Sequence, residues 1–337
     1  MILAVAVAGL IGLAWSDGRT SKLAPSGSPS SMADAGTDAG TDAISNAAGG
    51  AADQPGPAPT ASPEVVTPAP SPAPAVDVVA GPRPVAADDP VGLAAQIVAS
   101  ERAVGDPATT PDTLVAAAHV QQVAYRALGL RPDWDAAVLA EMPADLVERV
   151  QLNAAARREF MGMHTRPSDT LPTWRIVEPA PAPELLAYYR EAEASFGVGW
   201  EYLAAINLVE TGMGRIRGTS TAGARGPMQF IPSTWAAFGE GDIDSPRDSI
   251  LAAARYLAYN GFAEGNVDGA LFNYNRHPNY VRGVSNYARV MELDPQAFVG
   301  YYHWQIYYAS AAGDVWLPVG YEATEPVPAA DYLAANP

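Results

Sequence analysis

The chain has no cysteine in its 337 residues. Disulfides, thiolate metal sites, a thiol nucleophile and a lipid-modified N-terminal cysteine are therefore excluded. Positive charge is also scarce, because 20 Lys and Arg residues face 37 Asp and Glu residues, and Lys22 is the only lysine. With a formal net charge of −17, the chain gains nothing by counterion release at another polyanion, so we expect no nucleic-acid partner.

The N-terminal quarter has little that could fold. The uncharged apolar run at residues 1–15 is shorter than the roughly 20 residues that a membrane-spanning helix needs, and it is typical of the apolar core of a signal peptide. We expect export, with cleavage of this segment left open. Residues 16–90 are rich in Ala, Pro and Ser and cannot bury enough apolar surface to offset their chain entropy. This composition predicts a disordered linker. It is either a spacer that has to reach a certain distance or a linker with no particular length requirement.

Helical periodicity takes over after this linker. Apolar residues three and four apart predict helices at 91–104, 111–128, 143–161, 183–197, 200–212, 245–261, 269–275 and 280–291. Thr110 and Ser245 are the expected N-caps of two of them, each followed by proline at the first helical position. Because no strand pattern of any length appears, the predicted fold class is all-α. We expect a small helical domain at 91–166 and a second domain at 167–337.

One carboxylic acid, Glu210, has a position that suits chemistry. Leu203 and Ile206 precede it by seven and four residues, which places Glu210 on or beside the apolar stripe of its helix, near the C-terminal end. Burial and the negative end of the helix dipole both favour the protonated form, so we expect a raised pKa, as a general acid near neutral pH requires. Periodicity alone would favour a solvated glutamate at the edge of the stripe.

The motifs that follow favour the chemical interpretation. Glu210-Thr211-Gly212 precedes GARGPMQFIPSTW at 223–235, and ALFNYN lies at 270–275. Over residues 183–295 this order resembles the soluble lytic transglycosylase family, relatives of goose-type lysozyme. The tail at 301–321 looks like the end found in a secreted actinobacterial branch. The resemblance implies a lysozyme-like transglycosylase domain with a C-terminal extension.

The resemblance also assigns roles to individual residues. Glu210 matches the catalytic acid and base of the family. Six further residues match positions around the substrate: Thr211, Ser220, Met228, Gln229, Tyr274 and Asn275. Tyr274 is expected to hydrogen-bond Glu210. The chain departs from the family pattern at Thr211, where serine is usual, and at Pro227, where leucine is commoner, which leaves the shape of the groove open.

The implied reaction is cleavage of the β-1,4 bond between N-acetylmuramic acid and N-acetylglucosamine in peptidoglycan. Glu210 would act first as acid and then as base, closing a 1,6-anhydro ring. No second acid lies inside the motifs, since Asp242, Asp244 and Asp248 fit the cap of the next helix. A lysozyme-type hydrolase acting on the same bond and a non-catalytic peptidoglycan-binding module are the alternatives.

The expected partners and setting follow from this reaction. We expect peptidoglycan glycan strands as the substrate, a monomer, and a secreted or cell-envelope location with room for transient membrane association through residues 1–15. No cofactor is expected. We expect no metal either, because the four histidines are scattered and Pro246 replaces a required ligand in the calcium-loop-like spacing that starts at Asp242.

Overall fold

The computed structural model describes residues 83–164 and 166–336. The predictions for residues 1–15 and for most of the 16–90 linker lie outside these residues. Helices dominate the described secondary structure, so the predicted helical fold class is confirmed. No helix in the described part of the chain combines the length and the apolar character needed to cross a bilayer.

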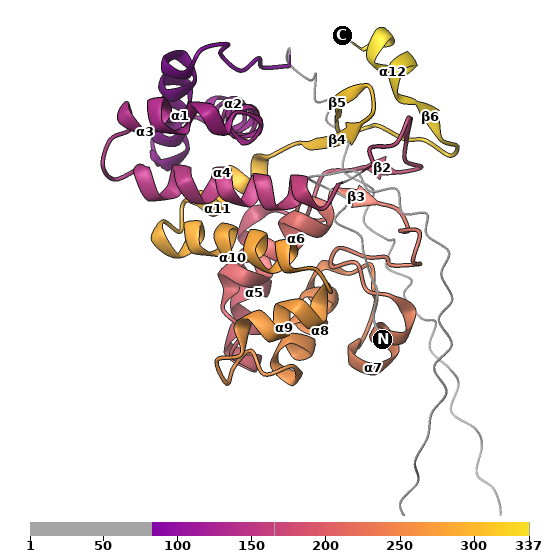
Figure 1. Ribbon diagram of the computed structural model, residues 1–337. Helices are drawn as coiled ribbons and strands as arrows, with labels where there is room; N and C mark the ends of the chain where they lie inside the picture. Colours follow the sequence, from indigo (N-terminus) through magenta and orange to yellow (C-terminus); the bar gives the residue numbers. More distant parts are fainter. Residues whose placement is uncertain (1–82, 165, 337) are drawn as a thin grey trace, which may run out of the picture. The chain divides into compact units, whose positions relative to one another are not determined.

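The first described elements are helices joined by short turns (Figure 1). They are α1 (Pro90–Gly105), α2 (Pro111–Leu130), the 3-10 helix η1 (Pro132–Trp134), α3 (Asp135–Ala140) and α4 (Val147–Gly162). The Thr110 hydroxyl accepts a hydrogen bond from the backbone N–H of Thr113, so the N-cap predicted for α2 is confirmed. The three helices predicted between residues 91 and 161 correspond to α1, α2 and α4.

The motif region is carried by a second group of helices. They are α5 (Ala182–Phe196), α6 (Trp200–Thr211), α7 (Pro232–Phe238), α8 (Pro246–Tyr259), α9 (Val267–Tyr274) and α10 (Pro278–Leu293), followed by α11 (Ala297–His303) and α12 (Ala329–Ala335). The Ser245 hydroxyl accepts from the backbone N–H of Asp248, which confirms the second predicted N-cap. These caps fix where α2 and α8 begin, and both helices start at a proline.

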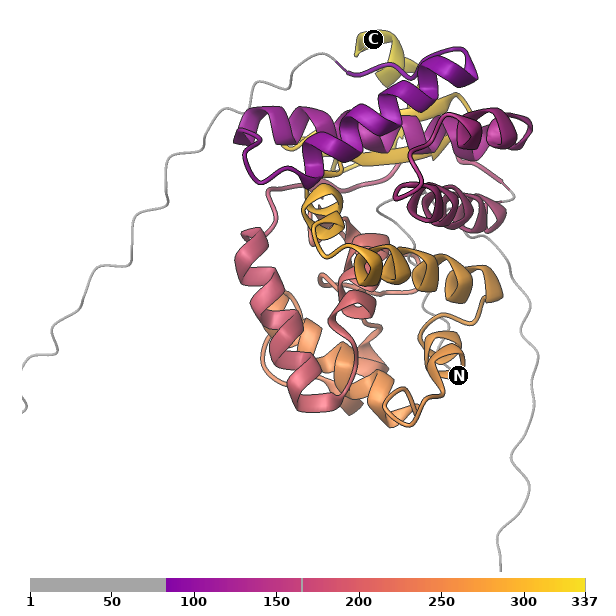
Figure 2. The ribbon, with the colours of Figure 1, turned by 90° about the vertical axis from the view of Figure 1, so that its left-hand side faces the viewer.

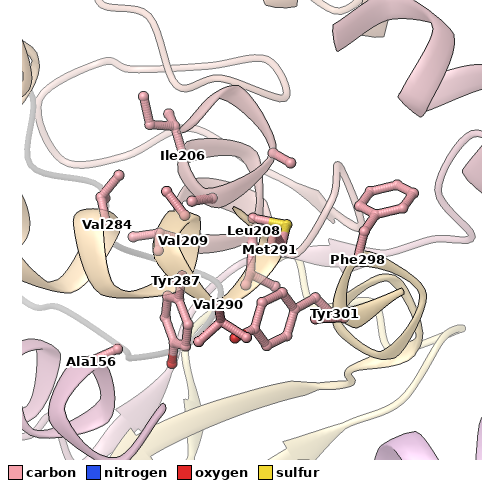
Figure 3. Packing of buried hydrophobic residues seen from close by; sticks show 14 of the residues in the cluster. Ala156, Ile206, Leu208, Val209, Val284, Tyr287, Val290, Met291, Phe298 and Tyr301 are labelled. Atoms are coloured by element: carbon pink, nitrogen blue, oxygen red, sulfur yellow. The ribbon is translucent and has the colours of Figure 1, made fainter. Parts of the chain in front are cut away.

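Helix α6 lies in the middle of the hydrophobic core. Every residue from Leu203 to Thr211 is buried, so the helix is covered on all sides rather than along the one apolar stripe that the sequence predicts. Figure 3 shows Ile206 and Val209 of α6 facing side chains of α10, among them Val284 and Met291. A carboxyl group near the end of such a helix is therefore surrounded by protein.

The N-terminal helices share this core. Helix α4 lies along α10 (Figures 1 and 2). The ring of Phe160 stacks on Tyr287 at a centroid distance of 5.8 Å and meets Tyr280 edge-on at 6.4 Å. Gly283 makes the contact possible, because a Cβ there would come within 2.5 Å of the Phe160 ring. All described residues belong to one compact unit, and the division at 166/167 stays a prediction.

The described strands are short and pair antiparallel in twos. The pairs are β1 (Thr170–Leu171) with β6 (Val327–Pro328), β2 (Arg175–Ile176) with β3 (Ile216–Arg217), and β4 (Ile306–Ser310) with β5 (Gly313–Leu317). The sequence predicts none of them. In β4 four of five residues are buried, so the alternation that marks a half-buried strand is missing. These strands enclose a second, smaller apolar cluster beside the end of α6.

Candidate active site

Glu210 lies at the C-terminal end of α6. Its residue is 3 % exposed, and Gly212 ends the helix two residues later in the left-handed conformation, with φ +59°. Burial raises the pKa of the Glu210 carboxyl well above its ordinary value of 4.5, because the charged form loses its hydration. The raised pKa that the sequence predicts is confirmed in direction. Its main cause is the burial of α6 on every side.

A hydrogen bond from Tyr280 opposes this shift. The Tyr280 hydroxyl donates to Oε1 of Glu210 at 2.9 Å and lowers the pKa of the carboxyl, because it stabilises the charged form. Tyr274 was expected to make this bond, and that prediction is wrong. The Tyr274 hydroxyl donates instead to the carbonyl oxygen of Met228 at 2.7 Å. The two tyrosine rings stack nearly parallel with centroids 6.3 Å apart, so Tyr274 supports Tyr280 from one side.

The mistaken assignment has a simple geometric origin. Tyr274 is the last residue of α9, whereas Tyr280 lies in the first turn of α10, the helix that packs along α6. Tyr280, Val284 and Tyr287 recur at intervals of four and three and are buried on one face of α10. That spacing is the sequence signal that could have identified Tyr280 as the tyrosine nearest to α6.

Buried hydrogen bonds attach the motif loop to the end of α6. The Thr211 hydroxyl donates to the carbonyl oxygen of Pro227 at 2.6 Å and accepts from the backbone N–H of Gly214 at 3.0 Å. The side-chain amide of Asn207 donates to the same Pro227 oxygen at 2.9 Å. Because Thr211 is 0 % exposed and committed to these bonds, it holds the loop against α6. Its role as a substrate contact stays a prediction that this geometry does not favour.

A tight turn then carries Gln229 to the side of Glu210. Backbone hydrogen bonds in both directions join Arg225 and Phe230 and close the turn. Gly226 has φ +77°, and a Cβ there would lie 2.1 Å from the carbonyl oxygen of Ile243, so only glycine fits. Gln229 also has a positive φ, +51°, which is a strained conformation for a side chain of this kind. Its amide donates to the Gly226 carbonyl oxygen at 3.0 Å.

Glu210 and Gln229 line one narrow pocket. Its lining comes from α6, the motif loop and the helices α7, α8 and α9: Glu210, Gln229, Phe230, Ile231, Thr234, Tyr256 and Tyr274. Glu210 is the only carboxylate among these residues. Aromatic rings make up much of the wall, with Phe230 and Tyr256 each in edge contact with Tyr274 at 6.1 and 5.8 Å. The pocket therefore offers one acid in a largely apolar setting.

Two buried polar side chains of the motif regions have no hydrogen-bond partner among the described residues, and of the two only Thr234 lines the pocket. The Thr234 hydroxyl lines the pocket and its residue is 5 % exposed. Asn275 follows α9 directly, is 2 % exposed, and has both its amide oxygen and its amide nitrogen unpaired. Buried polar groups are nearly always satisfied, so these two are candidates to bond a ligand or water. The sequence interpretation included Asn275 but missed Thr234, which lies inside the motif.

The side chains of the remaining predicted residues, Met228 and Ser220, lie away from the Glu210 pocket. Met228 is 0 % exposed and packs in the core, so only its backbone is used near the site, as the acceptor from Tyr274. The Ser220 hydroxyl oxygen accepts from the backbone N–H groups of Ala222 and Ala224 at 3.2 and 3.0 Å and closes the turn before Gly223. Neither side chain lines the Glu210 pocket. Their sugar contacts stay predictions.

No group of three His, Asp or Glu residues in the described ranges is arranged to hold a metal ion. Asp242 and Asp248 hydrogen-bond each other at the start of α8, where a carboxylate oxygen of Asp248 accepts from the Asp242 backbone N–H at 2.9 Å.

The residues that build this site match a known family. Residues 187–292 match the family described as Transglycosylase SLT domain. Over these residues the chain is similar to a transglycosylase SLT domain. This domain begins in α5 and ends in α10, so it holds Glu210, Tyr280 and the whole motif loop. The tail beyond it, including β4 and β5, lies outside the match, and its likeness to an actinobacterial branch stays a prediction.

Two curated proteins are similar over part of this domain. The membrane-bound lytic murein transglycosylase F of Thiobacillus denitrificans is 39 % identical over 80 residues, which is 24 % of this chain and 17 % of that protein. The protein of the same name from Nitrosospira multiformis is 32 % identical over 124 residues, 35 % of this chain and 26 % of that protein. The matches thus cover about a quarter of each relative or less. No solved structure matches the chain.

Proposed function

We propose that this chain is a peptidoglycan lytic transglycosylase in which Glu210 is the catalytic acid and base. The observation that carries the proposal is the single buried carboxyl group on the pocket of an SLT domain. Burial raises the pKa of this carboxyl above its ordinary value, which is the direction that protonation of a glycosidic oxygen requires. The substrate would be the β-1,4 bond between N-acetylmuramic acid and N-acetylglucosamine.

The proposed reaction uses the Glu210 carboxyl group twice, first as an acid and then as a base. Glu210 donates its proton to the glycosidic oxygen, the bond from that oxygen to C1 of N-acetylmuramic acid breaks, and the sugar N-acetyl group stabilises the positive charge at C1. The Glu210 carboxylate then takes the proton of the C6 hydroxyl while the C6 oxygen bonds to C1. The products are a 1,6-anhydro end and a free hydroxyl on the leaving sugar, and Glu210 is protonated again.

Tyr280 suits both halves of this cycle. Because its hydroxyl donates to Oε1 of Glu210, Oε2 is left as the oxygen that can carry the proton toward the substrate. The same hydrogen bond stabilises the carboxylate formed in the first step, so burial does not prevent Glu210 from giving up its proton. Tyr280 is a positioning residue in this scheme. Thr234 and Gln229 line the pocket and would offer polar groups to the substrate, and Thr234 has an unpaired hydroxyl. Asn275, whose amide is also unpaired, stays a proposed substrate contact.

The pocket also favours ring closure over hydrolysis. A lysozyme-type enzyme would need a water molecule activated at C1, and most glycosidases provide a second carboxylate in the site. Here Glu210 is the only acid on the pocket, and Phe230, Ile231 and Tyr256 give it apolar walls. We further propose that the enzyme works outside the cytoplasm as a monomer, with membrane association through residues 1–15 as an additional feature. The names of the two relatives describe those proteins as membrane-bound.

The decisive experiment is mass spectrometry of peptidoglycan digested by the purified chain. We expect fragments with a 1,6-anhydro end, lighter by one water than the fragments with a reducing end that a hydrolase leaves. Reducing ends alone would replace the transglycosylase by a lysozyme-type hydrolase with the same acid. If peptidoglycan is bound but not cleaved, the chain is a binding module.

A further inference from the structure

A second hollow, of about 1090 Å³, lies on the other side of the motif turn. Its lining includes Arg175 on β2, Arg217 on β3 and Arg225 in the motif loop, together with Asp244. Three arginines and one aspartate give this arginine groove a local charge of +2, in a chain whose formal net charge is −17. A positive site on so acidic a protein calls for a ligand of the opposite charge.

The pairing of β2 with β3 also favours a negatively charged ligand. Arg175 and Arg217 are direct partners across the two antiparallel strands. Like charges in directly opposite positions destabilise such a pair, so an anion bound between the two guanidinium groups would relieve their repulsion. The Asp244 carboxylate is taken by Arg225, and Arg217 donates to the Asp244 backbone oxygen at 3.3 Å. Arg175 makes no side-chain hydrogen bond or ion pair with any described residue and is exposed. Its guanidinium is available to a ligand.

The arginine groove and the Glu210 pocket are separated by one turn. Gly226 lines the groove, and Gln229, which lines the pocket, donates its side-chain amide to the Gly226 carbonyl oxygen at 3.0 Å. A polymer bound in the pocket therefore brings its side branches within reach of the arginines. In peptidoglycan the branches are peptide stems carried by N-acetylmuramic acid, and the free carboxylates of this polymer lie on those stems.

We infer that the arginine groove binds carboxylates of the peptide stem on the glycan strand that occupies the Glu210 pocket. A guanidinium group can form two parallel hydrogen bonds with a carboxylate, which neutral sugars cannot do. The groove would therefore bind the peptide stem, and the pocket would bind the glycan. The inference rests on the proposed function for the identity of the polymer. It adds a substrate preference: strands that keep their stems bind better than bare strands.

The test compares two substrates and two arginine variants. Glycan fragments with intact stems and the same fragments after an amidase has removed the stems are titrated calorimetrically into the Glu210→Gln protein, which does not consume them. Arg175→Gln and Arg225→Gln are added separately to that protein. Arg131→Gln is the matched control, because Arg131 is exposed, lies between α2 and η1, and makes no ion pair with the described residues. Thermal unfolding checks that each variant is folded.

We expect Arg175→Gln to weaken binding of stem-bearing fragments about 10-fold, the size of one lost charge-assisted hydrogen bond, and to leave binding of bare fragments unchanged. Arg131→Gln should change neither. Equal affinity of the variants and the parent for stem-bearing fragments would overturn the inference, as would equal weakening on both substrates. An effect that disappears when phosphate-bearing wall polymers are stripped from the fragments would assign the groove to those polymers and also overturn it.

Failure of the proposed function has a different signature. If the wild-type chain, with Glu210 intact, cleaves neither substrate, the transglycosylase proposal is refuted. A preference for stem-bearing fragments that depends on the arginines in the binding titration would still support the groove. A parent protein that cleaves both substrates, with variants that bind stems normally, refutes the groove and leaves the enzyme intact.

Discussion

The Glu210 pocket and the arginine groove lie on two sides of the same turn and have opposite physical character. The pocket is built where four helices and the motif loop meet, its acid is 3 % exposed, and its walls are mainly aromatic. The groove is built on a two-residue strand pair at the surface, and its charged side chains are half-exposed or exposed. Burial changes the protonation of a group, whereas recognition of charge needs groups that stay charged. Each hollow has the surroundings that its task requires.

The largest effect expected on the pocket side is the loss of activity in Glu210→Gln. Glutamine keeps the shape of the side chain but can neither donate a proton to the glycosidic oxygen nor take one back. Loss of general acid and base catalysis costs about 10²–10⁴-fold, and in the proposed mechanism Glu210 fills both roles, so the loss should reach the upper end of that range. Release of soluble fragments from peptidoglycan measures it.

Glu201→Gln is the control for this variant. Glu201 lies in the first turn of the same helix, is half-buried, and does not line the pocket. It should keep the parent rate. Full activity in Glu210→Gln would remove Glu210 from the mechanism, whatever the control does.

Variants of Tyr280 and Tyr274 distinguish an effect on the pKa of Glu210 from an effect on the packing around it. Tyr280→Phe removes the hydrogen bond to Glu210, which lowers the pKa of the carboxyl, so the pKa should rise further. The alkaline limb of the pH–rate profile should move to higher pH, and the rate at the optimum should fall about 10-fold as the carboxyl loses its orientation.

Tyr274→Phe is the matched comparison, because it removes a hydroxyl from a stacked neighbour that bonds the Met228 carbonyl instead. It should cost about 1–3 kcal/mol of stability, since it leaves a buried acceptor unpaired, and it should not move the alkaline limb. If Tyr274→Phe shifts the limb and Tyr280→Phe does not, the hydrogen bonds described for the two residues are exchanged in the working enzyme.

The sequence predicts the raised pKa of Glu210 but not its hydrogen-bond partner, and the reason is physical. Glu210 is specified locally, by its place at the end of a helix and by the motif that follows. Its partner depends on which of two nearby tyrosines meets α6, and this is fixed by the crossing of α10 over α6. The same holds for Thr211 and Met228, which the motif suggests as substrate contacts and the packing turns inward.

The arginine groove was beyond sequence reasoning for a related cause. Arg175 and Arg217 face one another only because two two-residue strands pair across a long separation in the chain. Strands of that length have no periodicity to detect. The eight predicted helices, by contrast, match α1, α2, α4, α5, α6, α8, α9 and α10 within a few residues, because apolar spacing, prolines and the Thr110 and Ser245 caps point to the same boundaries. The short helices α3, α7, α11 and α12 were not predicted.

The burial of Glu210 should also make the free energy of unfolding depend on pH. The pKa of Glu210 is raised in the folded protein, so the folded state binds a proton more tightly than the unfolded chain. Glu210 therefore disfavours folding increasingly as the pH rises above about 4.5, by about 1.4 kcal/mol per pH unit until the folded-state pKa is reached. Below pH 4.5 the carboxyl is protonated in both states and this cost vanishes.

Glu210→Gln has no such titration. Its free energy of unfolding in urea, compared with the parent between pH 4 and pH 8, should show an advantage that grows with pH from close to zero. A constant difference across that range would mean that Glu210 is solvated in the folded protein, and the contrast between the pocket and the groove would then be lost.

The smallest effect is expected in the groove, from Asp244→Asn. The Arg225–Asp244 ion pair joins side chains that are 50 % and 45 % exposed, and pairs of this kind contribute about 0–1 kcal/mol. Asparagine keeps the backbone oxygen that accepts from Arg217, so the free energy of unfolding should fall by less than about 1 kcal/mol. The change also frees Arg225 and adds one positive charge to the groove. Stem-bearing fragments should therefore bind a few-fold more tightly at low salt, with the gain lost as salt screens it, and bare fragments should bind as before. A loss of several kcal/mol in Asp244→Asn would show that the groove is a structural ion-pair cluster, and its arginines would then have no surplus charge to offer a ligand.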